Sequence, residues 1–343
     1  MQQDEGFPMT QTQPVKAAGS RSLRRGDRVR VRPIGDVLAT LDADGDNGGL
    51  PFMPEMLPMC GQTFEVAARA DKTCDTINLT GCSREMDDTV HLVEARCDGS
   101  AHGGCDAGCL FFFKEEWLES ANGENEREPH TGVQDDQEAA LATLESHTMS
   151  GPTTYRCQAT QVPEASRPME GIGHFVKDIS RRNVPLPVLR RGLRNAAFDR
   201  YQAISRGRLP AWARIRGGEE LPDVRGTLKK TPTELLDLMP GELVEVKSLE
   251  EIRATLSVNQ RNRNLWFDRE MVKYCGRQFR VLKRVERLLD EKTGEMLEPK
   301  TVSIILDGAV CVGDFHKLCP RQDYTFFREI WLRRVGAPAV GTP

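Results

Sequence analysis

Thiol and imidazole side chains recur at matched positions in this 343-residue chain. The segment Cys97–Leu118 reads CDGSAHGGCDAGCLFFFKEEWL, and Cys311–Leu332 reads CVGDFHKLCPRQDYTFFREIWL. Nine of the 22 positions are identical, and both copies keep the spacing Cys-x4-His-x2-Cys. Because metal-capable residues keep one spacing in two otherwise diverged segments, the pattern predicts a metal site in each copy.

A further aligned pair of cysteines, Cys60 and Cys275, completes a set of four in each copy. The predicted ligands are Cys60, Cys97, His102 and Cys105 in the first copy, and Cys275, Cys311, His316 and Cys319 in the second. Three thiolates and one imidazole form a closed tetrahedral shell, which is typical of a structural zinc site. For Cys60 and Cys275 the competing interpretation is a small buried apolar residue at a helix end.

The first copy contains more thiols than a closed zinc site needs. Cys74 and Cys109 have no cysteine counterpart in the second copy. Together with Cys97 and Cys105 they could supply four sulfurs to an iron–sulfur cluster, although the spacing matches no known cluster motif. A second, open metal position built from Cys74 and Cys109 is the other interpretation.

Cys74 is also the best candidate for a catalytic nucleophile. Lys72 would lower the pKa of its thiol, whereas the neighbouring Asp71 and Asp75 would raise it, so local charge does not decide its reactivity. A polar turn that contains one cysteine is the competing interpretation.

An internal duplication must position these side chains. Residues 26–72 match residues 241–287 without a gap at 16 of 47 positions, where background composition would give roughly three matches. In the first copy, alternating apolar residues predict strands at GDRVRVR, Thr63–Arg69 and Thr89–Ala95. Short helices are expected at residues 36–41 and 52–60. The second copy repeats this order, with a hairpin turn at residues 290–294 and a returning strand at 302–306.

The expected fold class is α+β, with two duplicated small mixed-β units joined by an amphipathic helical segment. Each unit resembles a small SH3-like or KOW-like barrel over about 50 residues, a resemblance that implies a shape and no function. The expected boundaries are a disordered tail at 1–24, the first metal-clipped unit at 25–119, a polar linker at 120–166, a basic helical segment at 167–232, the second metal-clipped unit at 233–335 and a loose tail at 336–343.

Charge is unevenly distributed along the chain. The net charge is −4, but residues 161–230 hold 15 Lys and Arg against 7 Asp and Glu. Arg190, Arg191 and Arg194 on a predicted helix indicate nucleic-acid binding as one hypothesis. Aromatic residues are not interleaved there as base stacking requires, so a solvated helix face, or docking onto the acidic remainder of the chain, competes with it.

Several functional classes lack support in the sequence. It contains no P-loop, G-x-G-x-x-G turn, H-E-x-x-H helix or G-x-S-x-G elbow, which weakens the common enzyme classes. No apolar run is long enough to cross a bilayer, and the N-terminus does not read as a secretory signal. We therefore expect a soluble cytoplasmic protein without membrane contact, in which ten cysteines are reduced or bound to metal.

The pattern F-x-x-E-M-x3-C-G, the DKTCDT segment, the Cys-x4-His-x2-Cys loop and the closing Trp-Leu pair occur together. With them the chain resembles a family of uncharacterised bacterial proteins over most of residues 26–335, a resemblance that carries no activity. The favoured function is a zinc-binding, non-catalytic interaction or scaffold protein with a protein partner. A metalloprotein with redox or catalytic chemistry in the first unit, and a nucleic-acid-binding protein, are the alternatives.

Overall fold

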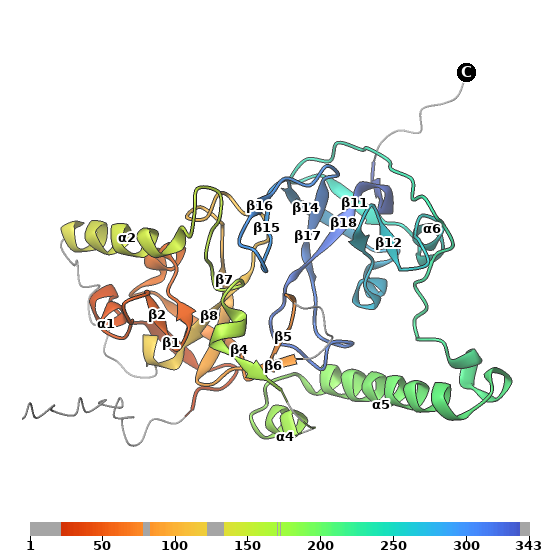
Figure 1. The fold of residues 1–343 in the computed structure, drawn as a ribbon, viewed down its shortest axis with the longest axis horizontal. Helices are drawn as coiled ribbons and strands as arrows, with labels where there is room; N and C mark the ends of the chain where they lie inside the picture. The colour runs from red at the N-terminus through yellow and green to blue at the C-terminus, as the bar shows by residue number, and fades with distance from the viewer. Residues whose placement is uncertain (1–21, 78–82, 122–133, 170, 172, 337–343) are drawn as a thin grey trace, which may run out of the picture.

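The fold is described from a computed structural model, which covers residues 22–77, 83–121, 134–169, 171 and 173–336. Most of the two predicted tails therefore lies outside the described residues. The chain is α+β. It has two halves, which correspond to the two copies of the duplication, and each half is built on a five-stranded antiparallel sheet (Figure 1). The strands of the first sheet are, in spatial order, β8 (Leu110–Lys114), β7 (Thr89–Arg96), β4 (Thr63–Arg69), β1 (Arg28–Val31) and β9 (Leu118–Ser120).

The second sheet has the same order of strands. They are β18 (Tyr324–Arg328), β17 (Ser303–Val310), β14 (Gln278–Val285), β11 (Leu243–Val246) and β19 (Leu332–Arg334). The registers also agree, because Val29 pairs with Phe64 in the first sheet and the aligned Val244 pairs with Phe279 in the second. Residues that align in sequence therefore occupy the same places in the two sheets.

The cores of the two halves repeat one set of contacts. The indole N–H of Trp117 donates to Thr40 Oγ1 at 3.0 Å, and that of Trp331 donates to Thr255 Oγ1 at 3.0 Å. Phe52 meets Trp117 edge-on with ring centroids 5.2 Å apart, and the aligned rings in the second half are 5.1 Å apart. These aromatic contacts hold the short helix before each predicted cysteine against its sheet.

Both 3-10 helices and α-helices connect the strands. The helices are α1 (Ile34–Leu38), α2 (Gln134–Thr148), α3 (Val162–Ala165), α4 (Gly173–Ser180), α5 (Leu186–Arg208) and α6 (Leu249–Arg253). The 3-10 helices are η1 (Pro54–Met59), η2 (Glu115–Trp117), η3 (Ala211–Ala213), η4 (Ile215–Gly218), η5 (Arg269–Tyr274) and η6 (Glu329–Trp331). The helix expected at residues 52–60 is thus a 3-10 helix with Pro54 at its start and Pro58 inside it, and proline inside an α-helix would remove a backbone hydrogen bond.

Short strands form the remaining small sheets. Three strands form one of them: β10 (Arg167–Pro168), β6 (Ser83–Glu85) and β5 (Thr73–Cys74). The two-stranded pairs are β2 (Asp46–Asn47) with β3 (Leu50–Pro51), β12 (Arg261–Asn262) with β13 (Leu265–Trp266), and β15 (Leu288–Leu289) with β16 (Met296–Leu297).

Each half sends a hairpin into the other half. The β15–β16 hairpin reaches the loop that follows β7, and the segment after β5 reaches the loop that follows β17. Leu289 belongs to the buried core of the first half together with Phe111 and Cys105. In the opposite direction, Arg321 of the second half donates to Thr76 Oγ1 at 3.0 Å. The two halves are therefore interlocked.

The segment expected as a polar linker contributes to the first core. Leu144, Cys157 and Val162 are buried in it. The amide of Gln158 donates to the carbonyls of Pro51 and Phe112 at 2.9 Å each. Residues that lie between the two sheets in the sequence thus pack against the first sheet.

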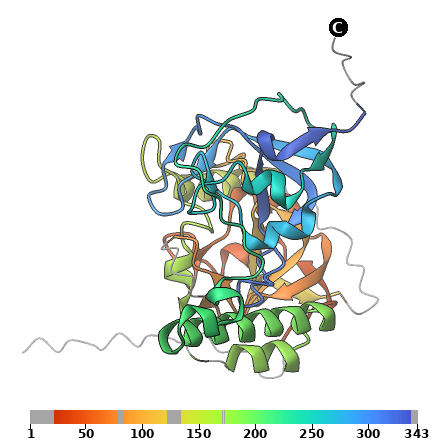
Figure 2. The same ribbon diagram turned by 90° about the vertical axis from the view of Figure 1, so that its right-hand side faces the viewer.

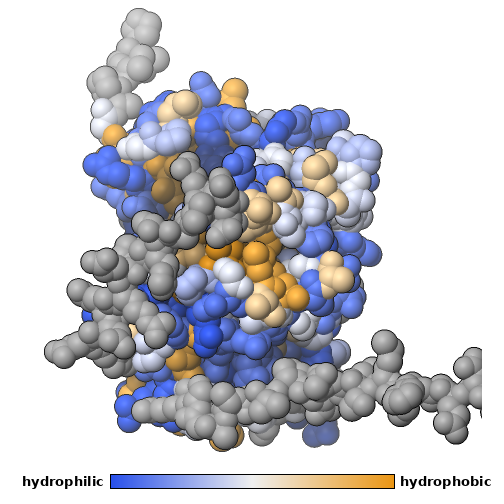
Figure 3. All heavy atoms as spheres, turned by 90° about the vertical axis from the view of Figure 1, so that its left-hand side faces the viewer, coloured by the Kyte–Doolittle hydropathy of each residue, from blue (hydrophilic) through white to orange (hydrophobic). Residues whose placement is uncertain are grey.

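The basic segment forms the two helices α4 and α5, which lie together at the bottom of the molecule (Figure 2). The opposite view, onto the first half, shows a mostly hydrophilic face with apolar side chains gathered near its centre (Figure 3). Within the described ranges, no helix has the length and apolar character needed to span a membrane.

Candidate metal centre

The first Cys-x4-His-x2-Cys loop follows β7 directly. It is folded by backbone hydrogen bonds from His102 N and Gly104 N to the carbonyl of Gly99, at 3.2 and 2.9 Å. Gly99 has φ +79°, and a Cβ atom there would lie 2.2 Å from the carbonyl oxygen of Cys105. Only glycine fits this position without displacing the backbone of Cys105. The glycine-rich sequence therefore bends the loop so that its ligands converge.

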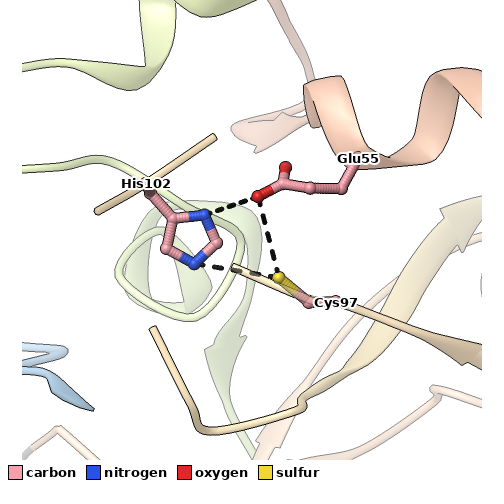
Figure 4. A group of neighbouring side chains, drawn as sticks. All are labelled: Glu55, Cys97 and His102. Atoms are coloured by element: carbon pink, nitrogen blue, oxygen red, sulfur yellow. Dashed lines mark hydrogen bonds and ion pairs between the residues drawn. The ribbon is translucent and has the colours of Figure 1, made fainter. Parts of the chain in front are cut away.

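Helix η1 brings a carboxylate to this loop. Glu55, in the first turn of η1, accepts a hydrogen bond of 3.0 Å from the backbone N–H of Ala101 through Oε1. The same oxygen lies 2.8 Å from His102 Nδ1 and 3.9 Å from Cys97 Sγ. His102 Nε2 is 3.7 Å from Cys97 Sγ. The imidazole ring thus stands between a carboxylate and a thiol (Figure 4).

The ligand atoms of Glu55, Cys97 and His102 all lie within 4.8 Å of one another. Glu55 and His102 are buried, and Cys97 is half-buried. Glu55 Oε2 and His102 Nδ1 are buried without a hydrogen bond of good geometry to any described residue. Leaving buried polar atoms unsatisfied is costly. A cation bound by a carboxylate, a thiolate and an imidazole would satisfy them, so the donor set fits a divalent transition metal.

Cys105 extends the cluster on the side of the second half. It is buried, hydrogen-bonds to His102, and accepts a hydrogen bond of 3.5 Å from the backbone N–H of Leu289. Burial raises the pKa of Cys105, but the hydrogen bonds from His102, Ala107 and Leu289 outweigh it, and the net pKa is lowered. A lowered pKa favours the thiolate, which is the form that binds metal.

Burial and the neighbouring side chains shift the pKa values of the residues in this cluster. Burial lowers the pKa of His102, but its interactions with Cys105, Cys97 and Glu55 raise it by more, and the net pKa lies above its usual range. Burial raises the pKa of Cys97. Cys157 is close enough to interact electrostatically with His102 and Cys97, and burial raises its pKa to about 11. An added cation would reverse these shifts and deprotonate the thiols.

Cys60 and Cys275, the fourth ligands expected from the sequence, lie at the C-terminal ends of η1 and η5. Cys60 packs on the apolar core, and burial raises its pKa to about 12. Burial raises the pKa of Cys275 to about 11. Neither belongs to the group of converging ligand atoms found among the described residues. Glu55 occupies the place in that group that the sequence analysis gave to Cys60.

Glu55 is not among the ligands expected from the sequence, although a signal for it exists. The pattern F-x-x-E-M-x3-C-G is shared by both copies, and its glutamates are Glu55 and Glu270. Glu270 accepts a hydrogen bond of 2.9 Å from the backbone N–H of Phe315, just as Glu55 accepts one from Ala101. A shared carboxylate in front of a shared cysteine is the feature that could have identified this ligand.

The second loop carries a different carboxylate beside its histidine. His316 Nε2 lies 3.1 Å from Asp268 Oδ2, and Asp268 occupies the place of Met53 in the first half. Burial lowers the pKa of His316, but the carboxylate of Asp268 outweighs it and the net pKa is raised. Burial raises the pKa of Cys311 well above its usual range. In the part of the chain that is described, no three ligand atoms of this half meet within 4.8 Å, and adding Cys74 of the first half does not make such a group.

The two extra thiols lie in different places. Cys74, in β5, hydrogen-bonds to Cys319 of the second half. Cys109 lies at the end of the first loop, and its backbone carbonyl accepts a hydrogen bond of 2.9 Å from Cys97 N. Cys74 and Cys109, the cysteines expected to form an additional metal position, therefore contact different residues.

A cavity of about 510 Å³ adjoins the cluster. Cys97, His102 and Cys105 line one part of its wall, and apolar side chains such as Phe112 and Leu289 line another. Ligand sites of small molecules are typically mostly apolar, with a few polar groups that fix orientation. The cluster is thus not sealed by protein on every side.

Comparison with known proteins finds no matching family model, no matching curated sequence and no matching solved structure.

Proposed function

We propose that the protein binds a zinc ion in its first half through Glu55, Cys97 and His102, with Cys105 as the fourth ligand, and that this metal has a structural role. The observation that carries the proposal is the position of the His102 ring, 2.8 Å from a Glu55 oxygen and 3.7 Å from the Cys97 sulfur in a buried cluster. Thiolate, imidazole and carboxylate are all zinc ligands, and four of them close the shell.

A metal in this place would join three segments that are distant in sequence. Glu55 comes from η1, the thiols come from the loop after β7, and Cys105 also contacts the hairpin of the second half through Leu289. Binding free energy at such a site stabilises the fold. We further propose that each half is an SH3-like unit, that the chain belongs to the bacterial family it resembles, and that it works in the reducing cytoplasm.

We propose a protein partner with an acidic surface that contacts the α4–α5 face. Helix α5 contains six arginines against one aspartate, and Arg190, Arg191 and Arg194 are exposed. Large apolar side chains are also exposed on these two helices: Val176, Ile179, Leu186, Leu193, Tyr201 and Ile204. A basic face with exposed apolar side chains suits a partner that offers both kinds of contact.

Two alternatives keep specific support. The cavity of about 510 Å³ beside the cluster favours a metalloprotein with catalytic or redox chemistry, in which zinc or an iron–sulfur cluster would supply Lewis acidity or electron transfer. The exposed arginines of α5 favour nucleic-acid binding, although Arg191 is already paired with Asp314 at 3.0 Å. Phosphate contacts would make such binding weaken steeply with salt.

The test is the metal content of the full chain and of the His102→Ala variant, purified without chelator under reducing conditions. We expect colourless protein that contains zinc, and the loss of one equivalent in His102→Ala. His147→Ala, which changes a histidine of α2, is the matched control and should keep its metal. Unchanged metal content in His102→Ala would refute the proposal, and a brown protein that absorbs visible light would favour the iron–sulfur alternative.

A further inference from the structure

The crossed hairpin of the first half carries a thiol into the second half. Cys74 in β5 hydrogen-bonds to Cys319 and lies close enough to Cys311 for an electrostatic interaction. Thr76, two residues further on, hydrogen-bonds to Glu291 and accepts from Arg321. These contacts fix the hairpin against the loop that follows β17.

The duplication gives this contact an independent meaning. With an offset of 215 residues, Thr73–Cys74 aligns with Leu288–Leu289, and both pairs form the first strand of a crossed hairpin. Leu289 reaches across to Cys105, the last cysteine of the first loop. Cys74 reaches across to Cys319, the last cysteine of the second loop. The two hairpins therefore occupy equivalent places, but only the first one brings a metal-capable side chain.

We propose that Cys74 is the missing fourth ligand of a second metal site, which it completes together with Cys311, His316 and Cys319. This set of three thiolates and one imidazole is complete for a tetrahedral zinc ion. Zinc binding would draw the four side chains together, since no three of their ligand atoms lie within 4.8 Å of one another. The proposal goes beyond the metal centre of the first half and does not depend on it. In this site Cys74, which comes from the first half of the chain, takes the place that the sequence pattern had assigned to Cys275.

The surroundings of the second loop suit a metal site. His316 has a carboxylate, Asp268, 3.1 Å from one ring nitrogen, which leaves the other nitrogen for a metal. A histidine ligand commonly has such a carboxylate partner, which fixes its orientation. Cys74, Cys311, His316 and Asp268 all line one open cavity, so a metal ion has a path from solvent to these side chains.

The first experiment compares the full chain with Cys74→Leu, which installs the residue that the other hairpin has at this place and so preserves the packing. Both proteins are loaded with Zn²⁺ for elemental analysis and with Co²⁺ for absorption spectroscopy. We expect Cys74→Leu to lose one metal equivalent together with the thiolate-to-cobalt absorption of that site. Cys74→His should keep the metal with a changed cobalt spectrum, because imidazole is also a ligand.

Two controls keep this result separate from the first site. Cys109→Ser removes a thiol from the neighbouring cavity and should leave both equivalents in place. Cys97→Ser should lose only the metal of the first half, so its effect and that of Cys74→Leu add. If Cys97→Ser retains all bound metal while Cys74→Leu loses one equivalent, the first site fails and the second one stands.

Two results would overturn the proposal. One is a Cys74→Leu variant with unchanged metal content and an unchanged cobalt spectrum. The other is an intact mass lower by two hydrogen atoms in protein purified under reducing conditions, with the difference absent in Cys74→Leu, because Cys74 and Cys319 would then form a disulfide rather than bind metal.

Discussion

The backbone N–H of Leu289 donates a hydrogen bond of 3.5 Å to the sulfur of Cys105, although the two residues are 184 positions apart. Through this contact the hairpin of the second half reaches the candidate metal centre of the first. Leu289 is only 5% exposed and belongs to the same core as Phe111 and Cys157. The stability of the first half therefore depends on a segment that lies outside it in sequence.

Leu289→Ala should destabilise the protein by about 2–5 kcal/mol, because it leaves a cavity in the first core. Urea unfolding measures this loss. Leu297→Ala is the matched control, since Leu297 lies in the same hairpin but is 42% exposed, and it should change the stability by roughly 0.5 kcal/mol or less. Equal losses in the two variants would contradict the role assigned to the crossed hairpin.

Gly99→Ala should disrupt the first loop and reduce metal binding. Its Cβ atom would lie 2.2 Å from the carbonyl oxygen of Cys105, in addition to the cost of a positive φ. Gly26→Ala separates the two effects, because Gly26 has φ +87° but has open space around it. We expect a loss of about 1–2 kcal/mol in Gly26→Ala and a larger loss in Gly99→Ala, measured by thermal unfolding together with metal content.

Arg321→Met should destabilise the contact between the halves. The Arg321 side chain is buried, donates to Thr76 and Glu291 at 3.0 Å each, and lies 3.1 Å from Asp323. Removing one partner of a buried ion pair leaves the other charge unpaired and costs about 3–5 kcal/mol. Arg333→Met, which removes an exposed pair, should cost roughly 1 kcal/mol or less. Denaturant unfolding of the two variants tests this difference.

His91 should make the protein less stable in acid. It is fully buried in β7, its Nδ1 is 2.8 Å from the carbonyl oxygen of Phe111, and burial lowers its pKa from 6.5 to about 4. Between these two values the unfolded chain binds a proton that the folded chain does not. Stability therefore rises with pH across this window and falls as the pH drops from 6.5 to 4, by roughly 3 kcal/mol at most.

The variant His91→Gln tests this expectation because it keeps an amide donor without a titrating ring. Its unfolding free energy, measured in urea at several pH values, should depend less steeply on pH between 4 and 6.5 than that of the unchanged protein. The pKa of His174 is also lowered to about 4, mainly by burial, but this residue is present in both proteins and cancels from the difference. Parallel pH profiles would show that His91 does not contribute.

The sequence predicts local structure better than it predicts which segments meet. The strand expected at Thr63–Arg69 is β4 with the same bounds, and the strand expected at Thr89–Ala95 is β7, one residue longer. The first residues of β4 alternate as expected for a sheet with one buried face, whereas Thr89–Leu92 at the start of β7 are all buried. The helix expected to carry Arg190, Arg191 and Arg194 is α5.

The candidate site could be predicted only in part, because its ligands come from distant segments. The loop ligands Cys97 and His102 follow from their spacing, and both belong to the converging group. Glu55 was missed although the F-x-x-E-M-x3-C-G pattern carries it in both copies, because only thiol and imidazole positions were assigned as ligands. Cys74 was assigned to its own half because nothing local in the sequence shows that its hairpin crosses to the other half.

The exchange of hairpins has a consequence for any chain that contains only one half. Such a fragment would leave its loop and part of its core uncovered, and a second molecule would have to supply the covering strand pair. A chain that contains both halves is in this sense a dimer joined by a peptide tether. Because the tether keeps one half at a high effective concentration around the other, the association of the two halves does not depend on the protein concentration.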